Sequence, residues 1–400
     1  MKTNWQTKKL SEVCDVFTDG NRIESKDQSS DGIRLIQTGN IGQGYFKDRG
    51  EKARYISEKT FKRLNCREIF ENDVLVSRLP DPVGRACIIP DTGERMITAV
   101  DCSILRFNKD IISSFFNYFS QSNNYLNNVE SMTSGTTRKR ISRNNLGIID
   151  IPIPPRSEQH SIVKKLDKVF RVIEKAKENT EKNLKNSKEL FESYLQNIFF
   201  QQGNDWEQKS LGEVIQKTET INPLNNPEKE FFYIDVSSVN KENFTIENTT
   251  LIKGKNAPSR ARKLIKTDDV IFATVRPTLR RIAIISEKLD GQICSTGYFV
   301  LRTKEVLNNK LLFYFLQTKE FFKQMEKLQK GASYPAVTDR DVRNRVISYP
   351  KPLLEQKIIV KKLDELSEKT KKLKEIYKQK LADLEELKKS ILKKAFEGNL

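Results

Sequence analysis

The residues with the clearest binding chemistry form a basic triplet on a small, hydroxyl-rich stem, "SGTTRKRIS" at residues 134–142. Threonine hydroxyls and arginine and lysine side chains are hydrogen-bond donors, and together they suit an anion such as a phosphate. A second segment, "KGASYPAVT" at residues 330–338, keeps the glycine, the hydroxyl and the β-branched residue before Ser or Thr, but it lacks the triplet. The glycine, hydroxyl and β-branched residues are therefore common to both segments, whereas the residues between them differ.

Catalytic and metal-binding chemistry has little support in the residue types. The single histidine, His160, would have to carry any Ser-His-Asp triad or multi-histidine metal site. The five cysteines are scattered and form no CxxC pair, which predicts reduced thiols in a cytoplasm. We find no G-x-x-x-x-G-K-[ST] phosphate loop and no D/N-P-P-Y/F motif. "GNIGQG" at residues 39–44 lacks the glycine spacing of a dinucleotide fingerprint, so we expect a tight turn or hairpin there.

The charge balance favours a polyanionic partner. The formal net charge is +18 and the pI is about 9.5, which suits nucleic acid first and an anionic membrane second, while surplus surface lysine remains the alternative. No apolar run reaches the roughly 18–20 residues that span a bilayer. The N-terminus has no apolar signal-peptide core. We therefore expect a cytoplasmic protein.

The chain repeats itself. "SEQHSIVKKLDKV" at residues 157–169 matches "LEQKIIVKKLDEL" at residues 354–366, and "WQTKKLSEV", "NDVLVSR", "GRACII" and "SILRF" have collinear counterparts at nearly the same shift. Several matches at one shift indicate a tandem duplication with a period near 197 residues.

Each half of the duplication has two parts. Short β-branched runs between Gly, Pro and Asp turns predict strands, and helices are expected near the end of each half. A proline-rich break then precedes one long helix, for which Ser157 is a plausible N-cap in the first copy. The predicted divisions are domain 1 (1–155), helix 1 (156–203), domain 2 (204–352) and helix 2 (353–400).

Both predicted helices carry apolar or small residues at alternating steps of four and three, with one extra residue in the middle, and Lys388 is the weak position. About 40 residues at about 1.5 Å each give about 60 Å, which is long for a helix that only covers its own domain. We expect the two helices to pair as an antiparallel coiled coil. The expected fold is therefore α+β, with two tandem mixed α/β domains related by a pseudo-two-fold axis.

Two divergent domains, each closed by "G-T/S … I/V-S/T" and then "EQ … I-V-x-x-L", resemble the specificity (S) subunit of Type I restriction–modification systems. "PPRSEQHSIVKKLD" and "PLLEQKIIVKKLD" carry the resemblance, with "GTTRKRIS" and "GASYPAVT" upstream, and it covers essentially the whole chain. The resemblance implies target-recognition domains that each read one half of an asymmetric, gapped DNA sequence. It also implies a non-catalytic chain that binds two modification (methyltransferase) subunits and restriction subunits. The partners would use S-adenosylmethionine, ATP and Mg²⁺, and this chain would bind no cofactor.

Candidate DNA contacts follow from the basic and hydroxyl residues of each domain. Residues 1–157 hold 24 basic and 19 acidic groups and residues 205–352 hold 25 and 18, so both domains are modestly basic and the contacts must be local. In domain 1 the candidates are Thr136, Thr137, Arg138, Lys139, Arg140, Arg143, Arg78 and Arg85. In domain 2 they are Ser333, Tyr334, Arg276, Arg280, Arg260 and Arg262.

Each candidate also has a structural interpretation. The triplet can be a solvated turn that leads into a helix capped by Ser142, and Arg78 and Arg85 can form internal salt bridges. The cluster at Arg260 and Arg262 can be a generic basic surface. The alternative function is a non-catalytic coiled-coil scaffold with two protein-binding lobes. An enzyme with an unrecognised site is a further alternative.

Overall fold

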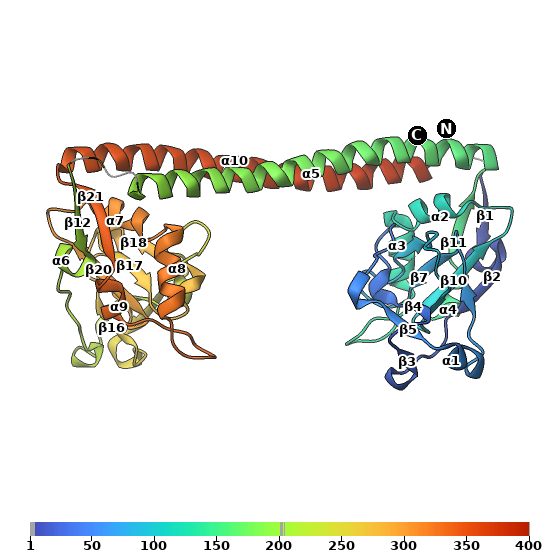
Figure 1. Cartoon of the computed structure of the whole chain (residues 1–400), viewed down its shortest axis with the longest axis horizontal. Helices are drawn as coiled ribbons and strands as arrows, with labels where there is room; N and C mark the ends of the chain where they lie inside the picture. Colours follow the sequence, from blue (N-terminus) through green and yellow to red (C-terminus); the bar gives the residue numbers. More distant parts are fainter. Residues whose placement is uncertain (1–4, 201–202, 204, 400) are drawn as a thin grey trace. The chain divides into compact units, whose positions relative to one another are not determined.

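The chain divides into two compact units, and the dividing points fall within its long helices. The computed structural model describes residues 5–200, 203 and 205–399. Unit 1 comprises Met1–Thr180 with Gln379–Leu400, and unit 2 comprises Glu181–Lys378. Both dividing points fall within the helices α5 (Arg156–Phe200) and α10 (Leu353–Phe396), which Figure 1 shows in green and red. Each unit is therefore one mixed domain together with a part of each long helix.

Unit 1 contains three sheets. A four-stranded antiparallel sheet has the order β2 (Cys14–Asp19), β10 (Cys102–Phe107), β7 (Val74–Ser77), β8 (Ala86–Ile88). A five-stranded sheet has the order β3 (Gln28–Ser29), β5 (Arg54–Ile56), β4 (Ile33–Ile36), β9 (Met96–Thr98), β6 (Glu68–Ile69), with β4 and β9 parallel. The first strand, β1 (Gln6–Lys9), pairs antiparallel with the last, β11 (Asp150–Ile153), so the domain is closed just before α5 begins.

Unit 2 repeats this plan. The first sheet has the order β13 (Ile215–Gln216), β20 (Tyr298–Thr303), β17 (Val270–Ala273), β18 (Ile282–Ile284). The second has the order β15 (Thr250–Lys253), β14 (Glu230–Ile234), β19 (Ile293–Ser295), β16 (Ala261–Leu264), with β14 and β19 parallel. The closing pair is β12 (Trp206–Ser210) with β21 (Val346–Pro350). The predicted tandem fold is confirmed by these orders, in which β3 of unit 1 has no counterpart among the described strands of unit 2.

Three short helices match between the units, the second, third and fourth of each list that follows, whereas Leu211–Val214 of unit 2 corresponds to the 3-10 helix Leu10–Val13 of unit 1. Unit 1 has α1 (Glu58–Arg63), α2 (Ser113–Phe119), α3 (Asn123–Ser131) and α4 (Arg143–Gly147). Unit 2 has α6 (Leu211–Val214), α7 (Asn309–Phe315), α8 (Lys319–Leu328) and α9 (Asp339–Arg343). Each helical run predicted near the end of a half is two helices, because Ser122 and Thr318 accept the backbone N–H groups of Tyr125 and Phe321 and start a new helix.

Single-turn 3-10 helices fill the connections of both units. They span Leu10–Val13, Ser25–Asp27, Thr38–Asn40, Gly50–Lys52, Pro223–Asn225, Val236–Ser238, Gly254–Asn256, Pro277–Leu279 and Glu287–Leu289.

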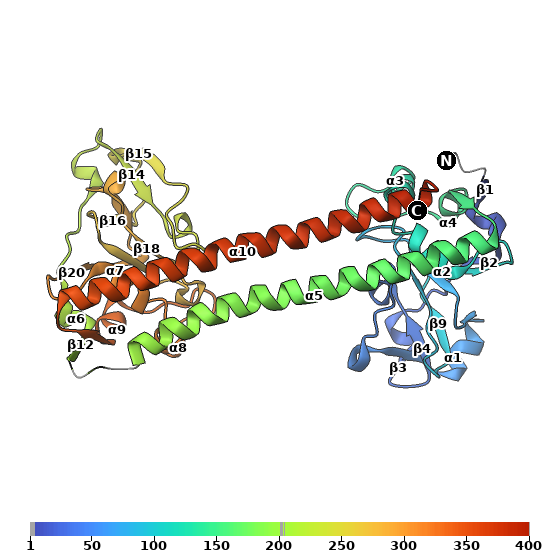
Figure 2. The ribbon, with the colours of Figure 1, turned by 90° about the horizontal axis from the view of Figure 1, so that it is seen from above.

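Within each unit the two long helices run side by side in opposite directions, as Figure 2 shows. Ile162, Leu166 and Ile173 of α5 share the core of unit 1 with Leu392 and Ala395 of α10. In unit 2 the relation is reversed, because Leu195 and Phe199 at the end of α5 share a core with Val360 and Leu363 at the start of α10. The predicted antiparallel pairing is thus built into the core of each unit.

Lys388, the charged residue among the apolar positions of helix α10, is accommodated by contacts with α5. Its ammonium group lies 5.1 Å from the centroid of the Phe170 ring and 3.9 Å from Glu174, so a cation–π contact and an ion pair fill the position. The neighbouring Leu387 is 47% exposed and does not take its place.

The repeated "EQ" places a fully buried glutamine at the start of each long helix. Gln159 donates to the carbonyl oxygens of Asp110 and Pro154 and accepts from the N–H of Ile112, at 2.8–2.9 Å. Gln356 makes the same three bonds with Val306, Pro350 and Asn308. These bonds satisfy backbone groups that would otherwise be buried without partners, and they fix each helix to its domain.

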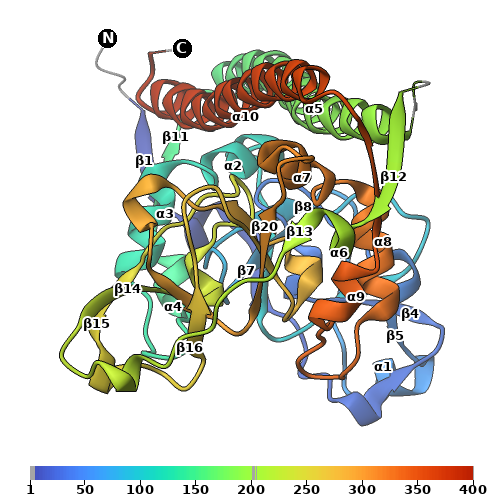
Figure 3. The same ribbon diagram turned by 90° about the vertical axis from the view of Figure 1, so that its left-hand side faces the viewer.

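A tyrosine on the helix that faces each long helix adds a second attachment. Tyr314 of α7 donates to Asp364 of α10 at 2.7 Å, and Tyr118 of α2 donates to Asp167 of α5 at 2.5 Å. Figure 3 shows α7 lying under the long helices in unit 2. Burial is the main cause that raises the pKa of both phenols. They therefore stay protonated and act as donors.

The repeated Asp-Val and Leu-Arg segments form the same ion pair in both units. Arg106 binds both carboxylate oxygens of the buried Asp73 at 2.8 and 2.7 Å. Arg302 binds both oxygens of the buried Asp269 at 2.8 Å. These pairs link β10 to the turn before β7, and β20 to the turn before β17. Part of the sequence repeat is therefore explained by internal charge pairing.

Two details at the helix ends differ from the expectations or lie outside the described residues. Helix α5 begins at Arg156, so Ser157 lies in its first turn, and the prediction that Ser157 caps the helix was wrong. In the segment "QQGNDW" at residues 201–206, which we expect to link helix 1 to domain 2, residues 201, 202 and 204 lie outside the described residues.

Candidate nucleic-acid interface

The two segments noticed in the sequence form equivalent hairpins. Ser134 and Arg140 exchange two backbone hydrogen bonds of 2.9 Å, and Lys330 and Ala336 do the same in unit 2. We call residues 134–140 hairpin 1 and residues 330–336 hairpin 2. Hairpin 2 joins α8 to α9 and projects from the body of unit 2 (Figure 1).

The retained glycine is required by the geometry of the hairpin. Gly135 and Gly331 both have φ +99°, a region that L side chains rarely adopt. A Cβ atom at Gly135 would lie 2.7 Å from the carbonyl oxygen of Arg138, and one at Gly331 would lie 3.1 Å from that of Tyr334. Arg138 and Tyr334 therefore occupy the same place in the two hairpins.

Each hairpin ends at the N-cap of a short helix. Ser142 accepts the N–H of Asn145 at the start of α4, which confirms the predicted cap. Thr338 accepts the N–H of Asp341 at the start of α9 and is part of a capping box. The base of each hairpin is thus held by a hydrogen bond to helix backbone.

Each hairpin also rests on a neighbouring loop, residues 78–85 (loop 1) in unit 1 and residues 274–281 (loop 2) in unit 2. The N–H of Ile141 donates to the Arg78 carbonyl oxygen at 3.2 Å, and that of Val337 donates to the Thr274 carbonyl oxygen at 2.9 Å. Arg78 and Thr274 are therefore equivalent positions. The structure brings each hairpin and its loop together.

The basic triplet of hairpin 1 is exposed, but two of its three cations are paired. Lys139 forms an ion pair with Glu130 of α3, and Arg140 lies 3.0 Å from Asp101. The side chain of Arg138 makes no hydrogen bond or ion pair with any residue that the structure describes. Glu130 and Asp101 were not foreseen, because nothing local in the sequence indicates that they lie near the triplet.

The remaining polar candidates of unit 1 lie around the same hairpin. Thr136 and Thr137 are exposed at its tip, and Arg143 is exposed in the first turn of α4. They are available to a phosphate, but their DNA contact stays a prediction.

Arg78 and Arg85 face the interior of unit 1. The Arg85 guanidinium donates to four carbonyl oxygens, those of Thr38, Ile41, Leu79 and Pro82, at 2.7–3.0 Å. Arg78 donates to the Val100 carbonyl oxygen and lies 3.2 Å from Asp19. Both are buried, and burial lowers the pKa of each guanidinium. The contacts favour the structural interpretation of these two arginines.

Loop 1 is thereby tied to the hairpin at residues 41–46. Ile41 pairs with Phe46, and the N–H of Gly42 donates to the Tyr45 carbonyl oxygen at 2.8 Å. The expectation of a tight hairpin for "GNIGQG" is confirmed.

In unit 2 the equivalent surface combines an arginine and a tyrosine. The Arg276 guanidinium lies 4.7 Å from the centroid of the Tyr334 ring, and its Nη2 is 3.4 Å from the Ser333 carbonyl oxygen. Arg276, Ser333 and Tyr334 are all exposed, and Tyr334 is 71% exposed. Arg280 instead lies over the Phe322 ring at 4.6 Å and 3.6 Å from Glu192 of α5.

The second basic cluster of unit 2 lies elsewhere. Arg260 is exposed just before β16, and Arg262 is half-buried on β16 with its Nη1 2.8 Å from the Ala261 carbonyl oxygen. In the described part of the chain, neither side chain contacts hairpin 2. The structure does not bring this cluster to the hairpin.

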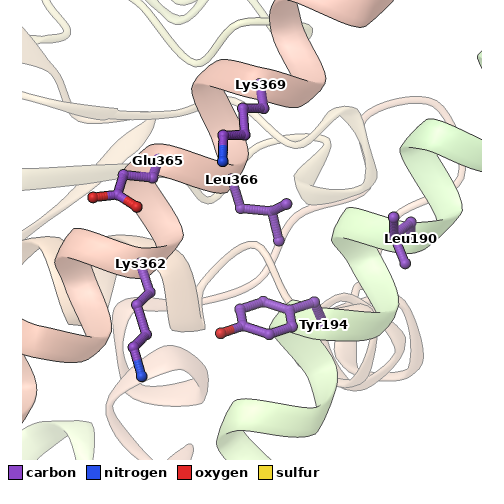
Figure 4. Close-up of a pocket in the computed structure, with 6 residues that line it drawn as sticks. All are labelled: Leu190, Tyr194, Lys362, Glu365, Leu366 and Lys369. Atoms are coloured by element: carbon purple, nitrogen blue, oxygen red, sulfur yellow. The ribbon is translucent and has the colours of Figure 1, made fainter.

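A different kind of surface lies between the long helices of unit 2. Leu190 and Tyr194 of α5 and Leu366 of α10 line a groove of about 360 Å³, flanked by Lys362, Glu365 and Lys369 (Figure 4). Leu190 is 65% exposed, although it is a large apolar side chain. Such a groove suits an amphipathic partner helix.

The corresponding helix faces of unit 1 are also apolar. Leu387 and Val172 are 47% and 65% exposed, and Ile391 and Val169 are half-buried. At a shift of 197 residues these positions correspond to Leu190, Lys369, Tyr194 and Leu366. Each unit therefore has its own apolar surface on the helix pair.

Neither a metal centre nor a membrane-spanning helix is found among the described residues. They contain no group of three or more His, Cys, Asp or Glu side chains placed to hold a metal ion. None of their helices is long and apolar enough to cross a membrane.

Comparison with known families supplies the decisive observation. The model of the type I restriction modification DNA specificity domain matches residues 2–185 and again residues 203–385. The chain belongs to this family. Its two copies of the specificity domain correspond to the two halves of the sequence repeat.

Curated relatives agree with this assignment. The specificity subunit of the type I restriction enzyme EcoKI from Escherichia coli (strain K12) is 23% identical and is aligned over 75% of this chain and 68% of its own length. The putative MjaX specificity subunit from Methanocaldococcus jannaschii is 25% identical over 99% of this chain and 94% of its own length.

Solved structures share the fold. A chain from a study of complex assembly and conformational transition of the type I R-M system has a TM-score of 0.81 at 20% identity, with both chains fully covered. The HsdS subunit from Thermoanaerobacter tengcongensis has a TM-score of 0.60 at 20% identity, covering 99% of this chain and 97% of its own.

Proposed function

We propose that this specificity-domain protein is the DNA-reading subunit of a type I restriction–modification complex, and that its two units read the two halves of an asymmetric, gapped site. The observation that carries the proposal is the pair of hairpins. Their backbones are equivalent, while their exposed tips are "TTRK" in unit 1 and "ASYP" in unit 2. Equivalent scaffolds with different tips would place different side chains on two half-sites.

The proposed DNA contacts are those that the geometry leaves available. Hairpin 1 offers Arg138 with Thr136 and Thr137, and hairpin 2 with loop 2 offers Arg276 and Tyr334. Exposed hydroxyl groups suit phosphate oxygens, and guanidinium groups suit phosphates or the O6 and N7 atoms of guanine. Arg78 and Arg85 support the loop from inside and are not part of this surface.

The proposed partners are two modification subunits, one on each helix surface, together with restriction subunits. Two equivalent apolar surfaces, at Leu190 and Tyr194 and at Leu387 and Ile391, support a stoichiometry of two. The partners would bind S-adenosylmethionine, ATP and Mg²⁺ and carry out adenine methylation or cleavage. In this proposal the chain itself is non-catalytic and acts in the cytoplasm, where the DNA is.

A substitution at hairpin 1 tests the recognition of DNA. In the complex with the modification subunit, Arg138→Ala should weaken discrimination in one half-site about 5- to 100-fold, since one good base contact carries about 1–3 kcal/mol. Preference in the other half-site should be unchanged. Arg67→Ala, at an exposed arginine outside the hairpins and loops, is the matched control. Equal losses in both half-sites would contradict a half-specific role for hairpin 1.

The scaffold alternative is separated by salt dependence. Phosphate contacts release counterions, so the DNA affinity of the assembled complex should fall steeply as salt rises. A flat or absent response to DNA, with partners present, would favour a protein-binding scaffold.

A further inference from the structure

Among the described residues of each hairpin and its loop, one exposed guanidinium makes no ion pair; Arg143 of α4, beside hairpin 1, is also exposed and unpaired. In unit 1 this guanidinium is that of Arg138, which makes no side-chain contact with the described residues. In unit 2 it is that of Arg276, which lies over the Tyr334 ring and near the Ser333 carbonyl oxygen and makes no ion pair with a described residue. Since an unpaired exposed guanidinium keeps its donors free, these two arginines can bind a new acceptor without breaking an ion pair.

The other arginines of these hairpins and loops are already engaged. Arg140 pairs with Asp101, and Arg280 pairs with Glu192. Arg281, the counterpart of Arg85, donates to the carbonyl oxygens of Val236 and Val239 at 2.8 and 3.0 Å. Among the described arginines of each hairpin and its loop, Arg138 and Arg276 are therefore the exposed ones without an ion pair.

Arg138 belongs to a hairpin and Arg276 to a loop, but their guanidinium groups lie at equivalent positions in the two units. Hairpin 2 has Tyr334 where hairpin 1 has Arg138. Loop 2 has Arg276 two residues after Thr274, where loop 1 has Pro80 two residues after Arg78. Because Arg276 stacks on Tyr334, its guanidinium is brought to the hairpin position that Arg138 occupies in unit 1.

Arg276 is held in place before any ligand binds. Its backbone lies in the left-handed region, with φ 50° and ψ 56°, which is uncommon for a residue with a side chain. Its N–H donates to the Pro335 carbonyl oxygen at 2.6 Å, and Val275 pairs with Ala336 beside it. An unusual backbone conformation that neighbouring bonds enforce is often found at functional sites.

We infer that each unit reads one guanine through the unpaired arginine of its hairpin or loop, with Arg138 acting directly from hairpin 1 and Arg276 acting from loop 2 on the platform of Tyr334. A guanidinium can donate two hydrogen bonds to O6 and N7 of guanine in the major groove. Tyr334 is a positioning residue, since it restricts the orientations of the Arg276 fork. This inference rests on the proposed DNA-reading function.

The test uses the complete complex of this chain with its modification subunit and a duplex that carries its methylation site. Each guanine of both half-sites is replaced singly by 7-deazaguanine, which lacks the N7 acceptor, and methylation rates are compared. For the wild-type protein, one guanine in each half-site should be sensitive, with a rate loss of about 10-fold. Arg276→Ala should remove the sensitivity in one half-site only, and Arg138→Ala in the other only.

Variants of the platform separate positioning from general folding. Tyr334→Phe keeps the aromatic ring and should retain the sensitivity, whereas Tyr334→Ala should reduce it at the guanine that Arg276 reads and nowhere else. Each unreplaced half-site serves as the internal folding control.

The possible outcomes distinguish this inference from the function on which it rests. A wild-type complex that methylates one specific sequence but is insensitive to 7-deazaguanine at every position would overturn the inference alone. So would an Arg276→Ala protein with unchanged sensitivity in both half-sites. Absence of any sequence-specific methylation by the wild-type complex would instead refute the proposed function.

Discussion

The C-terminal part of α10 should contribute to the stability of unit 1, although the rest of the unit 1 core comes from the first half of the sequence. Leu392 is 2% exposed and lies in the core of unit 1 with Phe115, Phe119 and Leu166. Leu392→Ala removes buried methyl groups and leaves a cavity, at a cost of about 2–5 kcal/mol. We therefore expect unit 1 to be destabilised, although the substitution lies only eight residues from the last residue of the chain.

Leu195 provides the reciprocal experiment. It corresponds to Leu392 at a shift of 197 residues, is 1% exposed, and lies in the core of unit 2 although it follows domain 1 in the sequence. Leu195→Ala should therefore destabilise unit 2 by a similar amount. Leu387→Ala, at a 47% exposed position of α10, is the control and should cost well under about 1 kcal/mol.

Hydrogen exchange of the intact protein resolves the two units. The strands β10 and β20 report on units 1 and 2, respectively. A loss of about 3 kcal/mol lowers protection by roughly 100-fold, so Leu392→Ala should affect β10 and Leu195→Ala should affect β20. If Leu392→Ala weakened β20 as much as β10, or left β10 unchanged, the assignment of the end of α10 to the core of unit 1 would be wrong.

Two further predictions concern the attachment of the helices and the partners. Gln356→Ala leaves the carbonyl oxygens of Val306 and Pro350 and the N–H of Asn308 without their partner. It should lower the free energy of unfolding, measured with denaturant, by about 2–4 kcal/mol. Gln379→Ala, on the exposed face of α10, is the control and should leave this free energy nearly unchanged. Tyr194→Glu in the groove of unit 2 should reduce the number of bound modification subunits from two to one by native mass spectrometry; unchanged binding of two would show that the groove is not a docking site.

The duplication made the fold predictable from the sequence. One shift located equivalent strands, equivalent glutamines and two long helices with matched apolar positions. The helix pairing followed from the spacing of these positions, because both seams need a partner of the same length. The exact start of a long helix was less predictable, because α5 begins directly after Pro155 and Ser157, the expected N-cap, lies in its first turn.

The candidate site was only partly predictable, because the sequence does not distinguish an exposed arginine from one that binds carbonyl oxygens. Arg85 and Arg138 look equally available in the sequence, but Arg85 is buried on four carbonyl groups and Arg138 is free. The stacking of Arg276 on Tyr334 joins residues 58 positions apart and depends on the left-handed backbone at Arg276. No local pattern encodes such a contact.

The most direct test of the proposed function is the pattern of DNA methylation that this chain directs. Single-molecule sequencing of DNA from cells that express the chain with its modification subunit should reveal methylated adenines within one gapped sequence whose two halves differ. Methylation scattered without a two-part motif, or none that depends on this chain, would contradict the account.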